Sequence, residues 1–191
     1  MTGQFVGFVR FVCMTDPLVY NTPPSVSIMH EASATREIRA DTAVVWEAID
    51  DFGGIDKFES TIERSGIIDG PETGEGAVRE CHFDDGSRTE EKIIEYEPGS
   101  SLTVEIIDYG GAPMEEGFTI KSVEAVDDTR TEVTWTHRFT PKYGPLGWLM
   151  AKLLIKSKIE ETFEDSLEDL DSYVTDEQAD QRSDRVESGP D

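Results

Sequence analysis

Two residues of opposite charge, Arg79 and Glu91, lie in strand-like segments and can form a buried pair. The segments cover 76–83 and 87–97, and the tight turn between them makes the two strands antiparallel neighbours. A buried charge without a partner is costly, so each side chain needs the other, or a polar ligand, to compensate it. A charge pair at an exposed sheet edge is the other interpretation that the sequence permits.

Proton transfer near neutral pH is chemistry that His137 can perform, because a neutral imidazole both donates and accepts a proton. His137 shares a strand face with Trp135, and a histidine in such a place is more often a core residue with satisfied hydrogen bonds. Tyr109, beside a predicted loop, can orient a carbonyl or hydroxyl group, or it can be an aromatic residue at a rim. With Glu91, these two residues are the candidates for catalysis.

Motifs for cofactor or covalent chemistry are missing from the sequence. It contains no Gly-rich phosphate loop, no paired histidines with metal-ligand spacing and no nucleophile elbow, so we expect no cofactor and no metal. Cys81 has no activating base within its own segment, which argues against nucleophilic catalysis. Cys13 is the other cysteine, so a disulfide framework is excluded and a reducing, cytoplasmic location is expected.

Acidic residues dominate the chain. Its 191 residues include 41 acids and 17 bases, for a net charge of −24, and such a surface repels nucleic acid and anionic lipid. Apolar periodicity excludes disorder for most of the chain and favours a folded protein suited to high salt, where repulsion between acids is screened. The lysines Lys152, Lys156 and Lys158 flank apolar residues, which permits either a transient membrane contact or a helix whose apolar face is core.

Apolar periodicity and turn residues define the expected elements. A strand at 33–40 precedes a helix at 42–50, for which Asp41 is a natural N-cap, and Gly53 and Gly54 end that helix. Six further strands follow, at 60–69, 76–83, 87–97, 101–109, 117–126 and 130–139. The apolar period then changes and predicts one long helix over 145–174, with a bent entry at Pro145 and Gly147.

Composition suggests three parts of the chain. Residues 1–28 contain a single acid, Asp16, and are either an additional strand or arm, or sequence upstream of a native start at Met29. We expect residues 1–32 to be an N-terminal extension and residues 33–174 to be one domain. Residues 175–191 have one large apolar residue, Val186, and are expected to be a disordered acidic tail.

The order of the elements predicts an α+β fold. Short spacing and tight turns indicate a curved antiparallel sheet of about seven strands, with two short helices after the first strand. The long C-terminal helix must cover the concave face, and the curvature leaves space for a ligand between helix and sheet. The hairpin loops at 84–87 and 109–116 are either gates to that space or ordinary turns.

The segments VVWEAIDDFGGIDKF, GAVREC and TEVTWTHRF, with the long last helix, resemble the START-like helix-grip superfamily. More narrowly, they are similar to its polyketide cyclase/dehydrase and lipid-transport branch, often called SRPBCC. The resemblance covers about residues 33–174, and its motifs indicate architecture better than activity. It implies that the short helices support the long one, with Trp46 as a structural anchor, and that Glu63 is a polar pocket residue.

Strand alternation, taken with this resemblance, predicts a set of ligand-binding residues on the inner wall. Of Val104 and Ile106, we expect only one to face inward. The predicted ligand-binding residues are Glu63, Arg79, Cys81, Phe83, Glu91, Ile93, Phe118, Ile120, Trp135, His137, Ile155, Ile159 and Phe163.

The expected function is binding without obligatory chemistry. A hydrophobic or amphipathic small molecule, such as a lipid, an isoprenoid or a polyketide-like compound, is held in an internal cavity and transported. The alternative is an aromatase/cyclase-type enzyme that uses His137, Tyr109 or Glu91 for proton transfer in the same cavity. An interaction module that uses the sheet or the helix ends is a third interpretation. It differs from the first two in needing no space for a ligand.

Overall fold

The structure is a computed structural model that describes residues 29–111, 114–142, 149 and 154–187, with the backbone alone described for 177–187. The predictions for residues 1–28 and for the helix entry at Pro145 and Gly147 lie outside the described residues. Lys152 lies outside them as well. The proposed loop at 109–116 is described except for residues 112 and 113.

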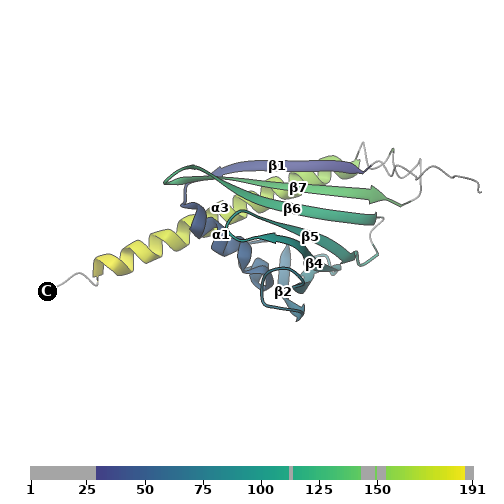
Figure 1. The fold of residues 1–191 in the computed structure, drawn as a ribbon, viewed down its shortest axis with the longest axis horizontal. Coiled ribbons are helices and arrows are strands. Elements are labelled where there is room, and N and C mark those ends of the chain that lie inside the picture. The colour runs from purple at the N-terminus through teal and green to yellow at the C-terminus, as the bar shows by residue number, and fades with distance from the viewer. Residues whose placement is uncertain (1–28, 112–113, 143–148, 150–153, 188–191) are drawn as a thin grey trace, which may run out of the picture.

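Seven antiparallel strands form one curved sheet in the order β1-β7-β6-β5-β4-β3-β2 (Figure 1). The last strand therefore lies beside the first. β1 begins at His30, three residues before its predicted start, and His30 pairs with Phe139 of β7. The strands are β1 (His30–Ile38), β2 (Ile62–Asp69), β3 (Val78–Phe83), β4 (Arg88–Glu97), β5 (Ser101–Asp108), β6 (Met114–Asp127) and β7 (Arg130–Pro141).

Two short helices follow β1, as predicted: α1 (Thr42–Asp50) and the 3₁₀ helix η1 (Phe52–Lys57). The Asp41 carboxylate caps α1 by accepting a hydrogen bond from the Ala43 amide at 2.8 Å. Inside η1, a Cβ atom on Gly54 would clash with the exposed Asp51 carboxylate, which would have to move. A Cβ atom on Gly53 would instead lie 3.1 Å from Cγ1 of Ile67, so each glycine makes room for a different neighbour.

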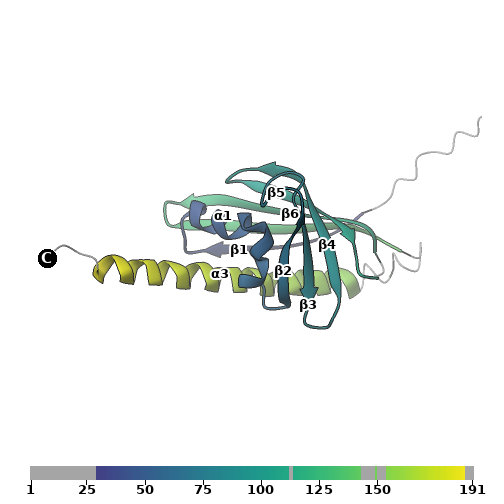
Figure 2. The same ribbon diagram turned by 90° about the horizontal axis from the view of Figure 1, so that it is seen from below.

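The long helix α3 (Lys156–Glu187) crosses the concave side of the sheet (Figure 2). It continues past the sheet, so residues 175–187, predicted to be a disordered tail, are helical (Figure 1). That prediction rested on the lack of large apolar residues. Once a helix is nucleated by packing, however, extending it through good helix formers such as Glu, Gln and Arg needs no further core.

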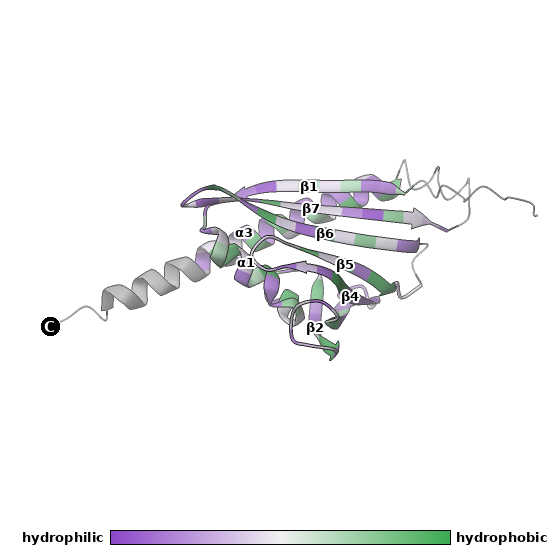
Figure 3. Ribbon diagram, viewed as in Figure 1, coloured by the Kyte–Doolittle hydropathy of each residue, from purple (hydrophilic) through white to green (hydrophobic). Residues whose placement is uncertain are grey.

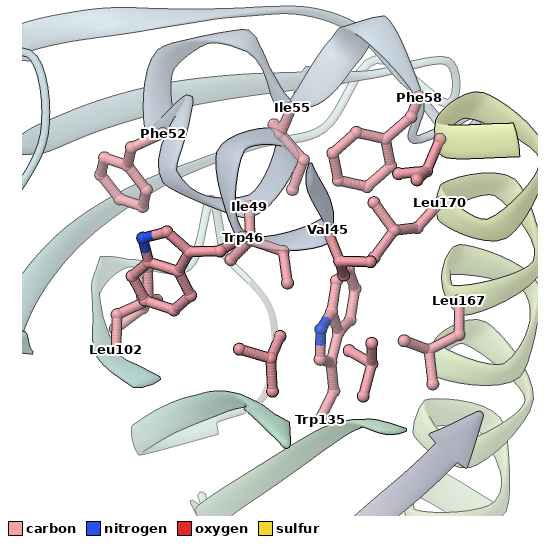
Figure 4. Close-up of a cluster of buried hydrophobic side chains, with 14 of the residues drawn as sticks. Val45, Trp46, Ile49, Phe52, Ile55, Phe58, Leu102, Trp135, Leu167 and Leu170 are labelled. Atoms are coloured by element: carbon pink, nitrogen blue, oxygen red, sulfur yellow. The ribbon is translucent and has the colours of Figure 1, made fainter. Parts of the chain in front are cut away.

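Apolar side chains fill one end of the space between sheet and helix. Hydrophobic and hydrophilic residues alternate along the strands, which gives the sheet one apolar face (Figure 3). In the core, α1 and η1 pack against Leu167 and Leu170 of α3, with Trp135 of β7 on the opposite side (Figure 4). Trp46 is buried in this core, in the role of structural anchor that its position predicts.

Candidate functional site

A cavity of about 280 Å³ lies between the sheet and the N-terminal half of α3, beside the core just described. Its size is just below the range of about 300–1,000 Å³ that is typical of small-molecule sites. Phe83, which precedes the hairpin loop at 84–87, and Met114, which lies within the loop at 109–116, belong to its wall. Its lining residues are Ile55, Glu59, Thr61, Ile62, Arg79, Phe83, Thr89, Glu91, Val104, Ile106, Met114, Thr119, Lys121, Trp135, His137, Lys158, Ile159, Thr162, Phe163 and Ser166.

Strand register gathers the polar lining residues into neighbouring pairs. Arg79 of β3 lies directly opposite Glu91 of β4. On the other half of the sheet, β6 and β7 pair Thr119 with His137 and Lys121 with Trp135. Because side chains two residues apart share a face, these pairs stand next to each other on the inner wall.

The pair of Arg79 and Glu91 is buried and well hydrogen-bonded. The Arg79 side chain is 4% exposed, and its Nη2 and Nε atoms donate to Glu91 Oε2 at 2.6 and 3.0 Å. Its third contact is a 2.8 Å hydrogen bond from Nη1 to the carbonyl of Phe52, whose ring lies 4.3 Å below the guanidinium. Burial alone would raise the pKa of Glu91, but the charge and hydrogen bonds of Arg79 hold it below its ordinary value.

Lys121 is a second buried cation, and only 7% of it is exposed. Its Nζ atom lies over the indole ring of Trp135, 3.8 Å from the ring centre. Among the described residues, no carboxylate lies within ion-pair distance of it. Burial, reinforced by the nearby charge of Arg79, lowers the pKa of Lys121 to about 8.

Glu59, which follows η1, brings a second carboxyl group to the cavity. It is buried, and Thr61 Oγ1 donates to its Oε1 atom at 3.2 Å. Burial raises the pKa of Glu59, and the nearby Ser166 hydroxyl, the charge of Lys121 and the hydrogen bond from Thr61 oppose the shift only in part. This carboxyl group is therefore easier to protonate than an exposed glutamate.

His137 is a buried, neutral imidazole. Its Nδ1 atom and the Thr119 hydroxyl form a 2.9 Å hydrogen bond, and either atom can be the donor. Burial lowers the pKa of His137 to about 4, so the ring is uncharged at neutral pH. Phe163 of α3 meets the rings of Trp135 and His137 edge-on, at 5.7 and 6.4 Å between ring centres.

Tyr109 lies close to Gly117 and His137 but is not one of the residues that line the cavity. Its hydroxyl is buried and has no hydrogen-bond partner among the described residues. It lies where the side chain of Gly117 would be, because a Cβ atom there would come within 2.6 Å of the Tyr109 hydroxyl and 3.1 Å of His137 Nε2. Burial raises the pKa of Tyr109 to about 12, which keeps the phenol protonated.

Part of the predicted ligand-binding set lines the cavity together. These residues come from β3, β4, β7 and α3, whose inward faces the alternation identifies. They are Arg79, Phe83, Glu91, Trp135, His137, Ile159 and Phe163.

Other predicted residues lie elsewhere. Glu63 is exposed, because its neighbour Ile62 takes the inward position at the start of β2. Cys81 and Ile93 are buried in the core rather than in the cavity wall, and burial raises the pKa of the Cys81 thiol to about 12. Ile155 is half-buried and outside the lining set.

On β6 the predicted face is the wrong one. Phe118 and Ile120 were expected at the wall because they are apolar, but Thr119 and Lys121 occupy it. The pairing of Thr119 with His137 decides the face, since paired residues point to the same side of the sheet. Val104 and Ile106 both line the cavity, because residues two apart on a strand share a face.

Sequence reasoning missed the polar residues Glu59, Thr119 and Lys121. For the last two, the signal was available in the alternation of β7, which fixes the inward residues of β6 once the hairpin register is known. Glu59 follows a 3₁₀ helix, so no strand alternation could place it. Phe118 and Ile120 were predicted to face the cavity because they are apolar. Apolarity does not identify the inward face of a strand when the cavity wall contains charged residues.

Other classes of site find no support in the part of the chain that the structure describes. Within those residues, no cluster of histidine, cysteine and acidic side chains could hold a metal ion. Likewise, none of the described helices is both long and apolar enough to cross a membrane. Lys156 and Lys158, considered above for membrane contact, pair with Glu160 and Glu161 of the same helix.

Solved structures share this fold. XoxI from Bacillus cereus superposes with a TM-score of 0.63 at 20% identity, covering 78% of this chain and 99% of that one. Ara h 8.0201 gives 0.63 at 18% identity, with 78% and 99% covered. A protein from Thermobifida fusca gives 0.59 at 21% identity, with 75% and 92% covered. At these identities the similarity shows the fold alone.

The sequence also matches a protein family. No curated protein matches the chain. The model of the family described as polyketide cyclase / dehydrase and lipid transport, however, matches residues 29–175, which include the whole sheet and the part of α3 that packs on it. Because it covers more than half of the chain, this match shows that the chain belongs to the polyketide cyclase/dehydrase and lipid transport family of the SRPBCC superfamily.

Proposed function

We propose that this protein binds, and carries, a hydrophobic or amphipathic small molecule in the cavity between the sheet and α3. The observation that supports this function is a cavity of about 280 Å³ beside a packed core, with aliphatic and aromatic walls and a few buried polar groups. Burying apolar ligand surface supplies about 25 cal/mol per Å², less the cost of ordering the ligand. The buried polar groups would fix the ligand's orientation.

Filling the cavity tests this function. Ile106→Trp adds a large side chain to a lining position, whereas Ile107→Trp, at the next residue, adds it to the exposed face of the same strand. Displacement of a fluorescent apolar probe by extracted lipids should show binding to the wild type and to Ile107→Trp, and loss of binding in Ile106→Trp. Equal binding by all three proteins, or by none, would contradict ligand binding in this cavity.

Proton-transfer catalysis of the cyclase/dehydratase type is the second candidate. It is favoured by the titratable groups with shifted pKa values that share the cavity, Lys121 at about 8 and Glu59 above its ordinary value. His137 and Tyr109 remain candidates to orient a carbonyl group. Incubation with a poly-β-ketone substrate should then give a cyclised product, and Glu59→Gln should abolish turnover while probe binding persists.

We propose further that the protein works in a reducing, salt-rich cytoplasm. Cys81 is a free, buried thiol, which a reducing compartment suits. The net charge of −24 over 191 residues suits high ionic strength. Mass spectrometry of the protein from its own cells, under thiol-trapping conditions, should find Cys81 reduced.

A further inference from the structure

Lys121 is a buried cation whose ammonium group lies against an aromatic ring and forms no ion pair with a described residue. It is 7% exposed, it lines the cavity, and its Nζ atom lies 3.8 Å from the centre of the Trp135 ring. An ammonium group has three donors, and a ring face satisfies it less well than an anion does. Among the described residues, no hydrogen bond or ion pair within 4 Å completes its shell.

The nearby carboxyl groups are already engaged. Glu91 accepts two hydrogen bonds from Arg79 on one oxygen and one from Thr89 on the other. Glu59 accepts a hydrogen bond from Thr61, and burial raises its pKa. Arg79 and Glu91 neutralise each other, so the polar part of the cavity keeps one unmatched positive charge whenever Glu59 is protonated.

The geometry points to a ligand with a single carboxylate: we propose that the cavity binds a medium-chain carboxylic acid whose carboxylate pairs with Lys121 on β6 and whose chain lies along the apolar wall. This inference rests on the proposed function. Whenever Glu59 is protonated, a monoanion supplies the negative charge that balances Lys121, and its two oxygens can accept hydrogen bonds from the ammonium group. A dianionic head group would instead bring an excess of buried charge.

The remaining lining residues fit the tail of such a molecule. Ile62, Val104 and Ile106 on the sheet and Ile159 and Phe163 on α3 form apolar walls. The volume of about 280 Å³ favours a chain of medium length over a long one. Decanoate and its uncharged counterpart, decanol, are therefore suitable probes, because they differ only in the head group.

The test compares the two probes on the full-length protein, by displacement of a neutral fluorescent probe. Wild type should bind decanoate at least about 10-fold more tightly than decanol. Lys121→Met should bind decanoate about 10- to 100-fold more weakly than wild type and decanol equally well, as expected for the loss of one charge-assisted contact. Lys92→Met is the matched control. It removes one positive charge from β4 at the residue next to Glu91, outside the lining set.

The outcomes separate this inference from the function it rests on. Equal wild-type affinities for decanoate and decanol, or the same loss in Lys92→Met as in Lys121→Met, would overturn the carboxylate assignment and leave cavity binding intact. Failure of both probes to bind would instead contradict the proposed function. If Lys121→Met does not fold, the wild-type preference between the two probes still decides, because it needs no variant.

Discussion

Individual buried polar groups in this protein differ in how completely they are paired. Arg79 is fully engaged by Glu91, the Phe52 carbonyl and the Phe52 ring. Lys121 has an aromatic neighbour, and the Tyr109 hydroxyl has no partner among the described residues. Paired groups should matter for stability and unpaired ones for ligand binding, because only the latter gain a partner when a ligand enters.

Breaking the Arg79–Glu91 pair should be strongly destabilising. In Arg79→Met, the carboxylate of Glu91 stays in a site where its side chain is 15% exposed, without its partner, which costs about 3–5 kcal/mol. Arg79→Met combined with Glu91→Leu should recover much of that loss, because no charge is then left unpaired. Urea denaturation of the three proteins measures this, and a double variant less stable than Arg79→Met would contradict it.

A side chain at position 117 should destabilise the protein, because the Tyr109 hydroxyl occupies the space that it would need. Gly117→Ala places a methyl group 2.6 Å from that oxygen, so the ring must shift, at about 1–3 kcal/mol. Tyr109→Phe removes the oxygen and should restore most of the stability in the double variant. A double-mutant cycle by thermal unfolding measures the coupling, and strictly additive effects would show that the two residues do not touch.

His137 should make the protein less stable in mild acid. Its folded pKa of about 4 lies below the ordinary value of 6.5, so between pH 6.5 and 4 the unfolded state binds a proton that the folded state does not. The free energy of unfolding should fall across this window by about 2–3 kcal/mol more in the wild type than in His137→Gln, with no further effect of this residue below pH 4.

Urea denaturation at a series of pH values measures the difference. His82→Gln is the control, because it makes the same change on β3 at a residue outside the cavity, where the ring contacts Glu80 and Arg64. Parallel pH profiles for wild type and His137→Gln would mean that His137 is not kept neutral by the fold.

At the scale of elements, periodicity predicted more of the fold than of the site. The α1 range, the seven strands and the helix-over-sheet arrangement follow from alternation, turn residues and the Asp41 cap. The inward face of β6 and the contribution of Glu59 depend on tertiary register, which local pattern does not contain. The C-terminal end of α3 was predicted too early, because good helix formers continue beyond the last apolar residues that pack on the sheet.

The C-terminal part of α3 should add little stability. Leu167, Leu170 and Val174 are fully buried, and they anchor the helix to the core. Removing residues 177–191 should change the urea midpoint only slightly, whereas Leu170→Ala should cost about 2–5 kcal/mol. A loss of stability on truncation as large as that of Leu170→Ala would show that the end of the helix makes stabilising contacts of its own.

The charge of the whole molecule should make its stability depend on salt. With 41 acids against 17 bases, the folded surface repels itself, and the repulsion is relieved when the screening length falls from about 10 Å at 0.1 M to about 3 Å at 1 M salt. We expect KCl over this range to raise the unfolding temperature, by about 2–4 °C for each kcal/mol that screening adds to the free energy of unfolding. Choline chloride should act similarly, since screening does not depend on the identity of the cation.

A charge-altered variant separates screening from other effects of salt. Glu63, Glu124 and Asp128 are exposed acids with no ion pair recorded among the described residues. Replacing the three by lysine changes the net charge from −24 to −18, and repulsion in the folded state should fall with it. The variant should be more stable than wild type at low salt and should gain less from KCl. If both proteins gain equally, salt acts through apolar burial rather than through the acidic surface.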